Sequence, residues 1–326
     1  MDIFKVTLGN GIQFDCSPDQ TILEGANTSG ISLEYSCKNG RCGVCKAQIV
    51  SGHKNLISRG AVSANFELGK DEILTCSAKP KSDLHLDIND LGDIGAIKAF
   101  TLPCRIHSLR KINDDICLIV LRLPPNSPFR FLPGQYIDII KGDIRRSYSI
   151  ANSPRDDNLI EVQIKNIQGG VLSHYFFNEA AENDLLRIEG PLGTFSLRED
   201  ESKTILFMAT GTGIAPIKAL LESSKLKNMD KNVVVVWGGR TERDFYLDLD
   251  CIDLEFRLVR VLSRVGKDGF YSGYVQNAVI DLGIDLSSAT CYACGSIEMI
   301  NDASMLLLNQ GLDRRRFYSD AFVSSD

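Results

Sequence analysis

The chain has 326 residues, of which 44% are apolar and 24% carry charge, and its formal net charge is −6. That length is enough for two or three domains, each with its own core. The basic residues are scattered, which argues against a nucleic acid as the main partner, because phosphate binding needs a concentrated basic face. No run approaches the ~18 apolar residues of a membrane span. The first residues alternate like a strand and lack the layout of a secretory signal, so we expect a cytoplasmic protein.

Residues 1–92 are predicted to form a small β-rich domain. The expected strands Ile3–Leu8 and Ile12–Cys16 are separated by a Gly-Asn-Gly turn, which is a strong hairpin signal. A short helix is expected over Thr21–Ser29, because Thr21 and Glu24 have the spacing of a capping box.

Four of the ten cysteines in the chain are grouped within this domain. Cys37, Cys42 and Cys45 have the spacing C-x₄-C-x₂-C, and Cys76 stands alone further on. Disulfides are disfavoured in a cytoplasmic chain, so grouped cysteines indicate metal or redox chemistry. The spacing is that of the ligands of a plant-type [2Fe–2S] cluster. Two glycines in the loop permit the close backbone approach that lets N–H groups point at the sulfurs.

Structural zinc is the alternative for this cysteine group. Zinc sites usually pair two short C-x₂₋₄-C hooks, whereas here three cysteines share one loop, so the pattern favours the iron–sulfur cluster. We expect most of the remaining cysteines to be small buried hydrophobes. These are Cys16, Cys104, Cys117, Cys251, Cys291 and Cys294.

Residues 101–198 are dense in alternating strand patterns, interrupted by Pro-Pro and Pro-Gly pairs. Many short strands at regular spacing predict an antiparallel barrel. The expected strands are Asp115–Leu123, Tyr136–Lys141, Ser147–Ala151 and Ile160–Ile167.

Arg146, Ser147, Tyr148 and Ser149 lie together in one of these strands. Alternation puts Arg146 and Tyr148 on one face, where the ring can lie against a planar cofactor and the guanidinium can reach a phosphate. Ser147 and Ser149 then face the other way, so a contact from Ser149 with a flavin needs its backbone or a local twist.

A Gly-rich turn follows further along this segment. Gly169, Gly170, Val171, Leu172 and Ser173 precede a predicted helix over His174–Ala181. Such a turn offers unpaired N–H groups and a positive dipole end to a pyrophosphate. Either motif alone could be an ordinary strand face or turn, but together, behind a cluster domain, they favour an FAD site.

In residues 199–326 the sequence pattern changes to apolar strands that are followed by Gly-rich turns and helices. That alternation predicts a parallel sheet in a nucleotide-binding α/β domain. The expected elements are the strands Thr204–Ala209, Val233–Trp237, Phe256–Leu262 and Ala289–Cys294 and a helix over Pro216–Leu226.

Two Gly-containing loops follow strands of this sheet. One is Gly211-Thr212-Gly213-Ile214-Ala215-Pro216, where the glycines make room for a pyrophosphate at the start of a helix. The other is Cys294-Gly295-Ser296 at the same sheet edge, where α/β domains bind ligands. The two loops together predict a nicotinamide nucleotide site.

Arg240 and Arg243 follow the second strand, where the adenosine ribose would be bound. Two arginines there could hold a 2′-phosphate and select NADPH, or they could belong to a solvated loop. The sequence leaves both interpretations open.

These three motif sets, in this order, resemble the ferredoxin–NADP reductase superfamily, in its architecture with an N-terminal ferredoxin domain. The resemblance implies a multidomain fold: a β-grasp [2Fe–2S] domain, an antiparallel β-barrel FAD domain and an α/β parallel-sheet nucleotide-binding domain. It implies FAD contacts from Arg146, Ser147, Tyr148, Ser149, Gly169, Gly170, Val171 and Ser173. It also implies that Gly211, Thr212, Gly213, Pro216, Cys294, Gly295 and Ser296 border the nicotinamide nucleotide, and that the ring of Phe322 covers the flavin. Thr210 and Arg240 are further expected cofactor contacts.

Within the superfamily, several stretches resemble the reductases of CDP-deoxyhexulose 3-dehydrases, which use NADH in dideoxysugar biosynthesis. They include Glu34–Lys38, Gly134–Asp138, Arg145–Asn152, Arg187–Pro191, Tyr292–Ser296 and Ser319–Val323. The chain departs from the usual pattern at Thr210, where Gly is usual, and at Ile214, where Phe is usual. The tract Gly238–Arg243 is more similar to reductases of aromatic-ring hydroxylases.

The resemblance implies that electrons pass from NADH, or NADPH, to FAD, to the cluster and then to an acceptor protein. Ser149, Cys294 and Phe322 would border the site of hydride transfer, with Phe322 swinging aside for the nicotinamide. The expected acceptor is a sugar 3-dehydrase, and the alternative is an oxygenase component. A non-enzymatic electron carrier and a zinc-stabilised binding module are the two other hypotheses.

Overall fold

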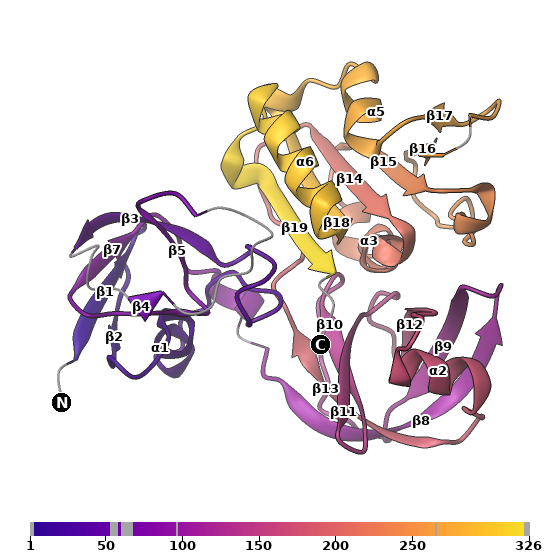
Figure 1. The fold of residues 1–326 in the computed structure, drawn as a ribbon, viewed down its shortest axis with the longest axis horizontal. Helices are drawn as coiled ribbons and strands as arrows, with labels where there is room; N and C mark the ends of the chain where they lie inside the picture. Colours follow the sequence, from indigo (N-terminus) through magenta and orange to yellow (C-terminus); the bar gives the residue numbers. More distant parts are fainter. Residues whose placement is uncertain (1–2, 53–57, 60–67, 96, 265, 323–326) are drawn as a thin grey trace. The chain divides into compact units, whose positions relative to one another are not determined.

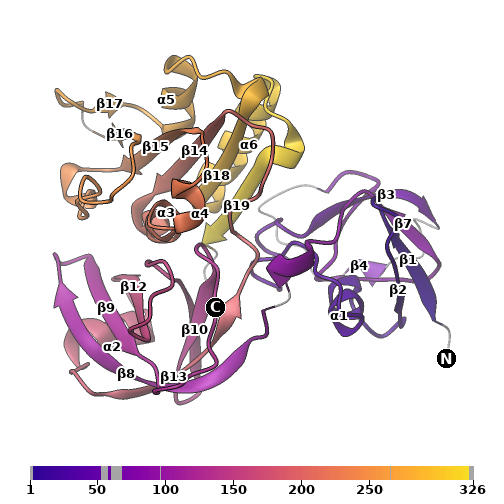
Figure 2. The same cartoon turned by 180° about the vertical axis from the view of Figure 1, so that it is seen from behind.

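The computed structural model describes residues 3–52, 58–59, 68–95, 97–264 and 266–322. The chain divides into two compact units, residues 1–98 and residues 99–326 (Figures 1 and 2). Each of the three larger sheets has a hydrophobic core of its own, one in the first unit and two in the second. The predicted three-part fold is confirmed.

The first unit contains β1 Phe4–Leu8, β2 Gln13–Cys16, α1 Ile22–Thr28, β3 Lys46–Gly52, β4 Ser58–Arg59, β5 Glu72–Leu74, β6 Ala78–Lys79 and β7 Leu84–Leu86. Its main sheet has the order β2-β1-β7-β3-β5, with β1 parallel to β7, as in a β-grasp fold. The predicted hairpin joins β1 to β2. The predicted capping box is also present, because Thr21 N donates to the Glu24 carboxylate at 2.8 Å and Glu24 N donates back to Thr21 Oγ1.

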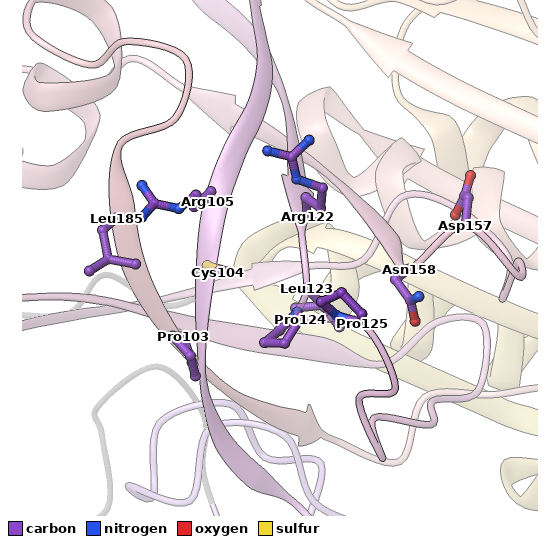
Figure 3. Close-up of a pocket in the computed structure, with 10 residues that line it drawn as sticks. All are labelled: Pro103, Cys104, Arg105, Arg122, Leu123, Pro124, Pro125, Asp157, Asn158 and Leu185. Atoms are coloured by element: carbon purple, nitrogen blue, oxygen red, sulfur yellow. The ribbon is translucent and has the colours of Figure 1, made fainter.

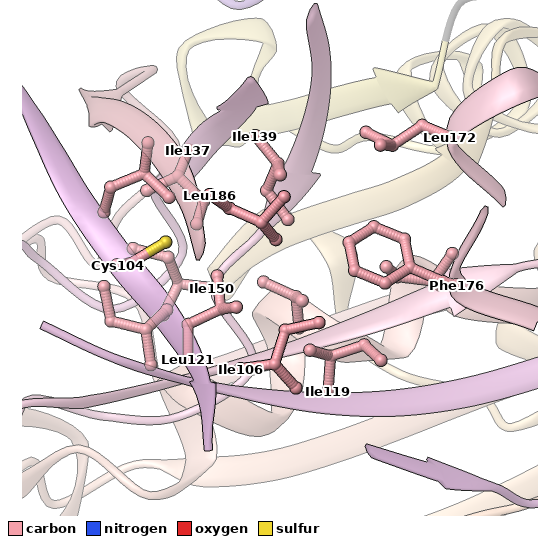
Figure 4. Packing of buried hydrophobic residues seen from close by; sticks show 14 of the residues in the cluster. Cys104, Ile106, Ile119, Leu121, Ile137, Ile139, Ile150, Leu172, Phe176 and Leu186 are labelled. Carbon is pink, nitrogen blue, oxygen red and sulfur yellow. The ribbon is translucent and has the colours of Figure 1, made fainter. Parts of the chain in front are cut away.

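The second unit begins with β8 Phe100–Lys111, β9 Ile116–Arg122, β10 Tyr136–Lys141, β11 Ile144–Ser149, β12 Leu159–Lys165, α2 Val171–Asn178 and β13 Leu185–Leu192. These strands form an antiparallel sheet in the order β11-β10-β13-β8-β9-β12, and a bridge between Ile150 and Val162 joins its two ends. The sheet therefore closes into the predicted barrel. Aliphatic and aromatic side chains such as Ile119, Ile137 and Phe176 fill its interior (Figure 4).

Two barrel strands have no counterpart among the predicted elements. β8 has only two fully buried side chains, Cys104 and Ile106, and charged residues near its end. β13 contains Gly190-Pro191, a pair that usually marks a turn. Both strands form because each pairs with two neighbours across the barrel, which local patterning does not reveal.

The second unit ends with β14 Thr204–Thr210, α3 Ile214–Leu221, α4 Ser224–Lys227, β15 Asn232–Gly239, β16 Arg257–Leu262, β17 Tyr271–Ser272, α5 Val275–Asp281, β18 Ala289–Ser296, α6 Ile297–Asn309 and β19 Phe317–Phe322. Every strand pair in this sheet is parallel. α5 and α6 lie in front of the sheet in Figure 1, and α3 and α4 lie in front of it in Figure 2. The predicted helix over Pro216–Leu226 is in fact two helices, because the Ser223 hydroxyl caps the start of α4.

The order of the parallel sheet, β17-β16-β15-β14-β18-β19, reverses direction between β14 and β18. In an open α/β sheet, ligands bind at such a reversal, outside the carboxyl ends of the strands. The two loops predicted to bind a nucleotide follow β14 and β18, so the topology places both at this point. No helix in the described part of the chain is long and apolar enough to cross a membrane.

A buried ion pair links the opposite, amino ends of the parallel strands. Asp200, just before β14, contacts Lys231, just before β15, with Nζ and Oδ1 2.6 Å apart, and both side chains are largely buried. Asp200 also accepts hydrogen bonds from Ser202 and from Thr290 of β18. Burial acts to raise the pKa of Asp200, but the hydrogen bonds from Lys231, Ser202 and Thr290 outweigh it and hold this pKa well below its usual range.

Replacing Asp200 by Asn should lower the free energy of unfolding of the second unit by about 2–3 kcal/mol at pH 7, because it leaves the Lys231 charge unpaired. The folded-state pKa is depressed, so this stabilisation is complete above the ordinary carboxyl pKa of ~3.9 and is lost as the pH falls below it. The difference between variant and parent in urea unfolding should therefore shrink below about pH 4.

The matched control is Asp253→Asn, which removes an ion pair to Lys227 in which the carboxylate is fully exposed. It should change stability by less than about 0.5 kcal/mol. If Asp200→Asn and the parent had equal stabilities at pH 7, the Asp200–Lys231 pair would contribute nothing to the free energy of unfolding.

Candidate functional site

The cysteine loop lies between α1 and β3 and has no regular secondary structure. Its shape depends on three residues with left-handed backbone: Lys38, Gly40 and Gly43, with φ of 56°, 77° and 77°. Glycine adopts this conformation without strain, which explains two of the three residue types. The loop folds back so that Cys42 N lies 3.4 Å from Cys37 Sγ.

The four predicted ligands form two close pairs. Cys37 pairs with Cys42, and the sulfurs of Cys45 and Cys76 are 3.2 Å apart. A hydrogen bond from the Cys42 thiol, with backbone N–H groups, lowers the pKa of Cys37. In the same way, Cys45 and then the Gly40 N–H lower the pKa of Cys76. The lowered pKa values of Cys37 and Cys76 favour the thiolate, which is the form that binds iron.

The pairing fits a binuclear cluster, in which each iron takes two cysteine sulfurs. A structural zinc site instead has its four ligands converge on one ion. The hydroxyl of Thr75, next to Cys76, is buried and has no partner within the described chain. A buried hydroxyl without a partner beside a predicted ligand fits a site that holds a further group. Both observations fit the [2Fe–2S] hypothesis.

The strand β11 presents the flavin motif with the predicted alternation. Arg146 and Tyr148 are two residues apart in the strand, so their side chains project from the same face. Burial raises the pKa of the Tyr148 hydroxyl, and the charge of Arg146 acts against that rise. Ser147 lies on the other face, where its hydroxyl donates to Asp138 at 2.6 Å, and Ser149 is buried. The Tyr148 face can support a planar ring, whereas the Ser147 hydroxyl, on the other face, already donates to Asp138 of the neighbouring strand β10.

The Gly-rich turn before α2 has a different boundary from the predicted one. Gly169 is left-handed, with a φ of 76°, and the helix begins at Val171, three residues before the expected start. Ser173 is buried in its first turn, and its hydroxyl donates to the Gly170 carbonyl at 3.0 Å. The Val171 side chain is exposed. What the turn can offer a phosphate is therefore its backbone N–H groups.

The start of α2 and the flavin strand share one face of the barrel. No side chain caps the helix at Gly170. The ring of Phe176, from the second turn of α2, meets the Tyr148 ring edge-on, with centroids 6.5 Å apart. An aromatic face beside an uncapped helix N-terminus suits a cofactor that joins a planar ring to a pyrophosphate.

The nucleotide loop after β14 lies directly against the end of β18. Gly211–Gly213 forms one turn of 3₁₀-helix that leads into α3, and Thr212 within it is buried. A Cβ on Gly213 would lie 2.1 Å from the Cys294 carbonyl oxygen, so only glycine fits there. No side chain caps α3, and Pro216 in its first turn has no N–H to leave unpaired.

Thr210, the departure from the family pattern, connects the two loops. Its hydroxyl is 3.4 Å from Ser296 N, at hydrogen-bonding distance. A Cβ on Gly295 would lie 2.1 Å from the same hydroxyl oxygen, so Thr210 fills the space beside this glycine. The Ser296 hydroxyl accepts from Met299 N and so caps α6.

Cys294 and Phe322 lie at the same sheet edge but differ in exposure. Cys294 is completely buried, and burial, followed by the charge of Asp320, raises the pKa of its thiol well above the ordinary value. It is therefore a neutral thiol. Phe322 ends β19 opposite Ser296 and is 40% exposed.

Arg240 and Arg243 are both exposed in the loop that follows β15. The Asp244 carboxylate sets the shape of this loop by accepting from Arg240 N at 2.7 Å and from Thr241 N at 2.8 Å. The two guanidinium groups are thus presented to solvent on the side of the sheet where an adenosine would lie. This geometry fits a phosphate contact and a solvated loop equally well.

Trp237 supports the nucleotide loop and was not among the predicted site residues. It is the single tryptophan of the chain and is completely buried in β15, where its indole N–H donates to the Gly211 carbonyl at 3.1 Å. The sequence gives no signal for this contact, because an apolar strand of a parallel sheet predicts only a buried side chain.

An open hollow of about 530 Å³ lies on the barrel away from all of these residues (Figure 3). Two arginines line the hollow, but both are already bonded to Asn183. Arg105 donates to the backbone carbonyl of Asn183, and Arg122 donates to its side-chain oxygen. None of the predicted site residues lines the hollow. Its other lining residues are Pro103, Cys104, Leu123, Pro124, Pro125, Asp157, Asn158 and Leu185.

Replacing Cys45 by Ser should reduce the bound iron to a small fraction of the parent level, because it removes one sulfur of a close pair. FAD should remain bound, since the flavin motif belongs to the other unit, and NADH oxidation by ferricyanide should persist. The matched control is Cys251→Ser, the exposed cysteine, which should keep its full iron content. Iron content and the visible spectrum measure both, and full iron in Cys45→Ser would contradict the assignment.

Replacing Gly213 by Ala should push the loops after β14 and β18 apart. A displacement of about 1 Å near reacting groups can cost ~100-fold in rate, so we expect kcat/KM for NADH to fall at least tenfold. Cluster and FAD content, measured on the same sample, should stay unchanged. An unaltered kcat/KM would mean that this contact does not shape the nucleotide site.

Three family models match the chain, in the order of its three larger sheets. They are a 2Fe-2S iron-sulfur cluster binding domain over residues 6–81, an oxidoreductase FAD-binding domain over residues 103–197 and an oxidoreductase NAD-binding domain over residues 207–305. The predicted cofactors, a [2Fe–2S] cluster, FAD and a nicotinamide dinucleotide, are confirmed.

Relatives match the chain over almost its whole length. It is 41% identical to the CDP-6-deoxy-L-threo-D-glycero-4-hexulose-3-dehydrase reductase of Yersinia pestis, over 97% of both chains. It is 29% identical to reductase component 1 of terephthalate 1,2-dioxygenase from Comamonas sp., over 96% of this chain and 95% of that one. The structure of Amycolatopsis cytochrome P450 reductase GcoB superposes with a TM-score of 0.75 at 25% identity, covering 99% of this chain and 100% of that one. The chain therefore belongs to the ferredoxin–NADP reductase superfamily, as an NAD(P)H-dependent FAD and [2Fe–2S] oxidoreductase with an N-terminal ferredoxin domain.

Proposed function

We propose that this chain is the cytoplasmic reductase of a CDP-6-deoxy-hexulose 3-dehydrase and supplies that enzyme with electrons from NADH for dideoxysugar formation. The observation that carries the proposal is the 41% identity to the Yersinia pestis reductase, which extends over 97% of both chains and so includes all three domains. The general activity, oxidation of NAD(P)H by an iron–sulfur flavoprotein, is common to the whole family.

The cofactors carry the redox chemistry: FAD takes up an electron pair as hydride and gives up electrons singly, and the cluster transfers one electron at a time. The protein binds and orients them. We assign the flavin ring to the Tyr148 face of β11 and its pyrophosphate to the backbone at Gly170–Ser173. Cys37, Cys42, Cys45 and Cys76 hold the cluster.

We assign the nicotinamide nucleotide to the edge where the loops after β14 and β18 meet. The backbone N–H groups at the start of α3 would bind the pyrophosphate, and Phe322 would cover the flavin and move aside for the nicotinamide. Cys294 borders this site as a neutral thiol, so it acts through packing and weak hydrogen bonding and not as a nucleophile. Ser149, at the end of β11, lies on the barrel side of the same site.

An oxygenase reductase is the second candidate, and specific observations favour it. The terephthalate 1,2-dioxygenase reductase component matches nearly the full length of the chain at 29% identity. The sequence of the tract Gly238–Arg243 also resembles such reductases. The two candidates share the same electron path and differ only in the acceptor protein. The difference in identity, 41% against 29%, favours the dehydrase.

The acceptor is tested with purified components under anaerobic conditions. NADH oxidation by the chain should become dependent on both a CDP-6-deoxy-hexulose 3-dehydrase and its sugar nucleotide, and the deoxygenated sugar should accumulate in proportion to the NADH consumed. Cys45→Ser should lose this activity while it still reduces ferricyanide. Stimulation by a terminal oxygenase component and none by the dehydrase would overturn the proposal in favour of the second candidate.

A further inference from the structure

The barrel strand β12 carries two polar side chains that contact the nucleotide-binding part of the same unit. Glu161 and Gln163 are two residues apart, so they project from the same face of the strand. The Glu161 carboxylate lies 3.1 Å from Lys218 Nζ on α3. The Gln163 side-chain oxygen accepts a hydrogen bond from the hydroxyl of Tyr246, which follows β15.

Lys218 is the centre of the first connection. Its ammonium group contacts the Ala151 carbonyl at 3.0 Å, Glu161 at 3.1 Å and Glu222 at 2.6 Å. An ammonium has three N–H donors, and these three acceptors use all of them. The side chain is only 17% exposed. The Glu222 carboxylate also accepts from Ser153 N at 3.1 Å, so it reinforces the same contact.

Both ends of this connection lie next to the proposed cofactor sites. Ala151 is completely buried and continues the chain just beyond Ser149, the last residue of the flavin strand β11. Lys218 lies on α3, which begins directly after the nucleotide loop Gly211–Gly213. A single amine therefore holds the nucleotide loop to the end of the flavin strand.

The second connection runs from Gln163 through Tyr246 and Trp237 and also reaches the nucleotide loop Gly211–Gly213. Burial raises the pKa of Tyr246 well above its ordinary value, so its hydroxyl remains a donor to Gln163. The Tyr246 ring meets the Trp237 ring edge-on, with centroids 5.6 Å apart. Trp237 in turn donates to the Gly211 carbonyl at 3.1 Å. Two separate chains of contacts thus fix Gly211–Gly213 relative to β12.

We propose that Lys218 is a positioning residue for hydride transfer, with Tyr246 in a supporting role. Hydride transfer requires the reacting atoms to approach to about 3–3.5 Å, and a misplacement of ~1 Å can cost 100-fold in rate. Lys218 maintains this separation without touching either cofactor. The inference rests on the cofactor sites assigned under the proposed function and is independent of which protein accepts the electrons.

The test compares Lys218→Met with Lys225→Met. Methionine keeps the length of the side chain but donates no hydrogen bond, and Lys225 is a partly exposed lysine that pairs with Glu199, itself 82% exposed. Stopped-flow measurement of flavin reduction by NADH under anaerobic conditions separates the rate of hydride transfer from the Kd for NADH. In Lys218→Met the rate should fall about 10- to 100-fold with the Kd within ~2-fold, whereas Lys225→Met should match the parent.

Tyr246→Phe breaks the second connection at a different place and keeps the proposal testable if Lys218→Met does not fold. It should also slow hydride transfer at an unchanged Kd. A readout without turnover is amide hydrogen exchange over residues 211–217, which should quicken in both variants and not in Lys225→Met.

Parent-like rates of flavin reduction in both variants would overturn the inference, and so would a loss of bound FAD in Lys218→Met, which would make the role purely structural. Failure of the proposed function gives a different result: the parent protein would be reduced by NADH normally but would not support the dehydrase.

Discussion

At the carboxyl edge of the parallel sheet, the backbone of Gly213 lies so close to Cys294 that an added Cβ would be 2.1 Å from a carbonyl oxygen. This contact brings together the loops that follow β14 and β18, at the point where the strand order reverses. The uncapped start of α3 and the exposed ring of Phe322 both lie beside it. This close approach sets the relative position of the two loops assigned to the nicotinamide nucleotide.

The same edge must also be held at a defined distance from the flavin strand, which belongs to a different sheet. The barrel strand β12 provides this fixed distance. It is joined by the closing bridge to Ile150, which comes just after β11. From β12, polar contacts lead to the nucleotide loop by way of Lys218 and by way of Tyr246 and Trp237.

Patterns that depend on neighbouring residues were predictable. β10 has the bounds that alternation predicted, and the capping box at Thr21 and the spacing of Cys37, Cys42 and Cys45 were evident in the sequence. In each case the information lies within a few residues of the chain. The pairing of the four cysteines and the engaged hydroxyls of Ser147 and Ser173 required the structure, since a motif indicates residue types and not their partners.

Long-range contacts could not be predicted for the same reason. The acceptors of Lys218 on the barrel are 57 and 67 residues away in sequence, and β8 and β13 are strands because of the neighbours that they pair with. Trp237 looks like any buried strand residue until its partner Gly211 is seen. The residues around a helical lysine such as Lys218 do not reveal whether its charge is solvated or is buried in a contact between two sheets.

Electrons that enter at the edge shared by β14 and β18 should leave singly from the loop that holds Cys37, Cys42, Cys45 and Cys76. This order is measured by rapid mixing of the purified protein with one equivalent of NADH, followed by visible absorbance and freeze-quench EPR. The EPR signal of the reduced cluster should appear only after flavin absorbance is lost and should be absent from flavin-depleted protein. A cluster signal that forms at the same rate without flavin would contradict this order of transfer.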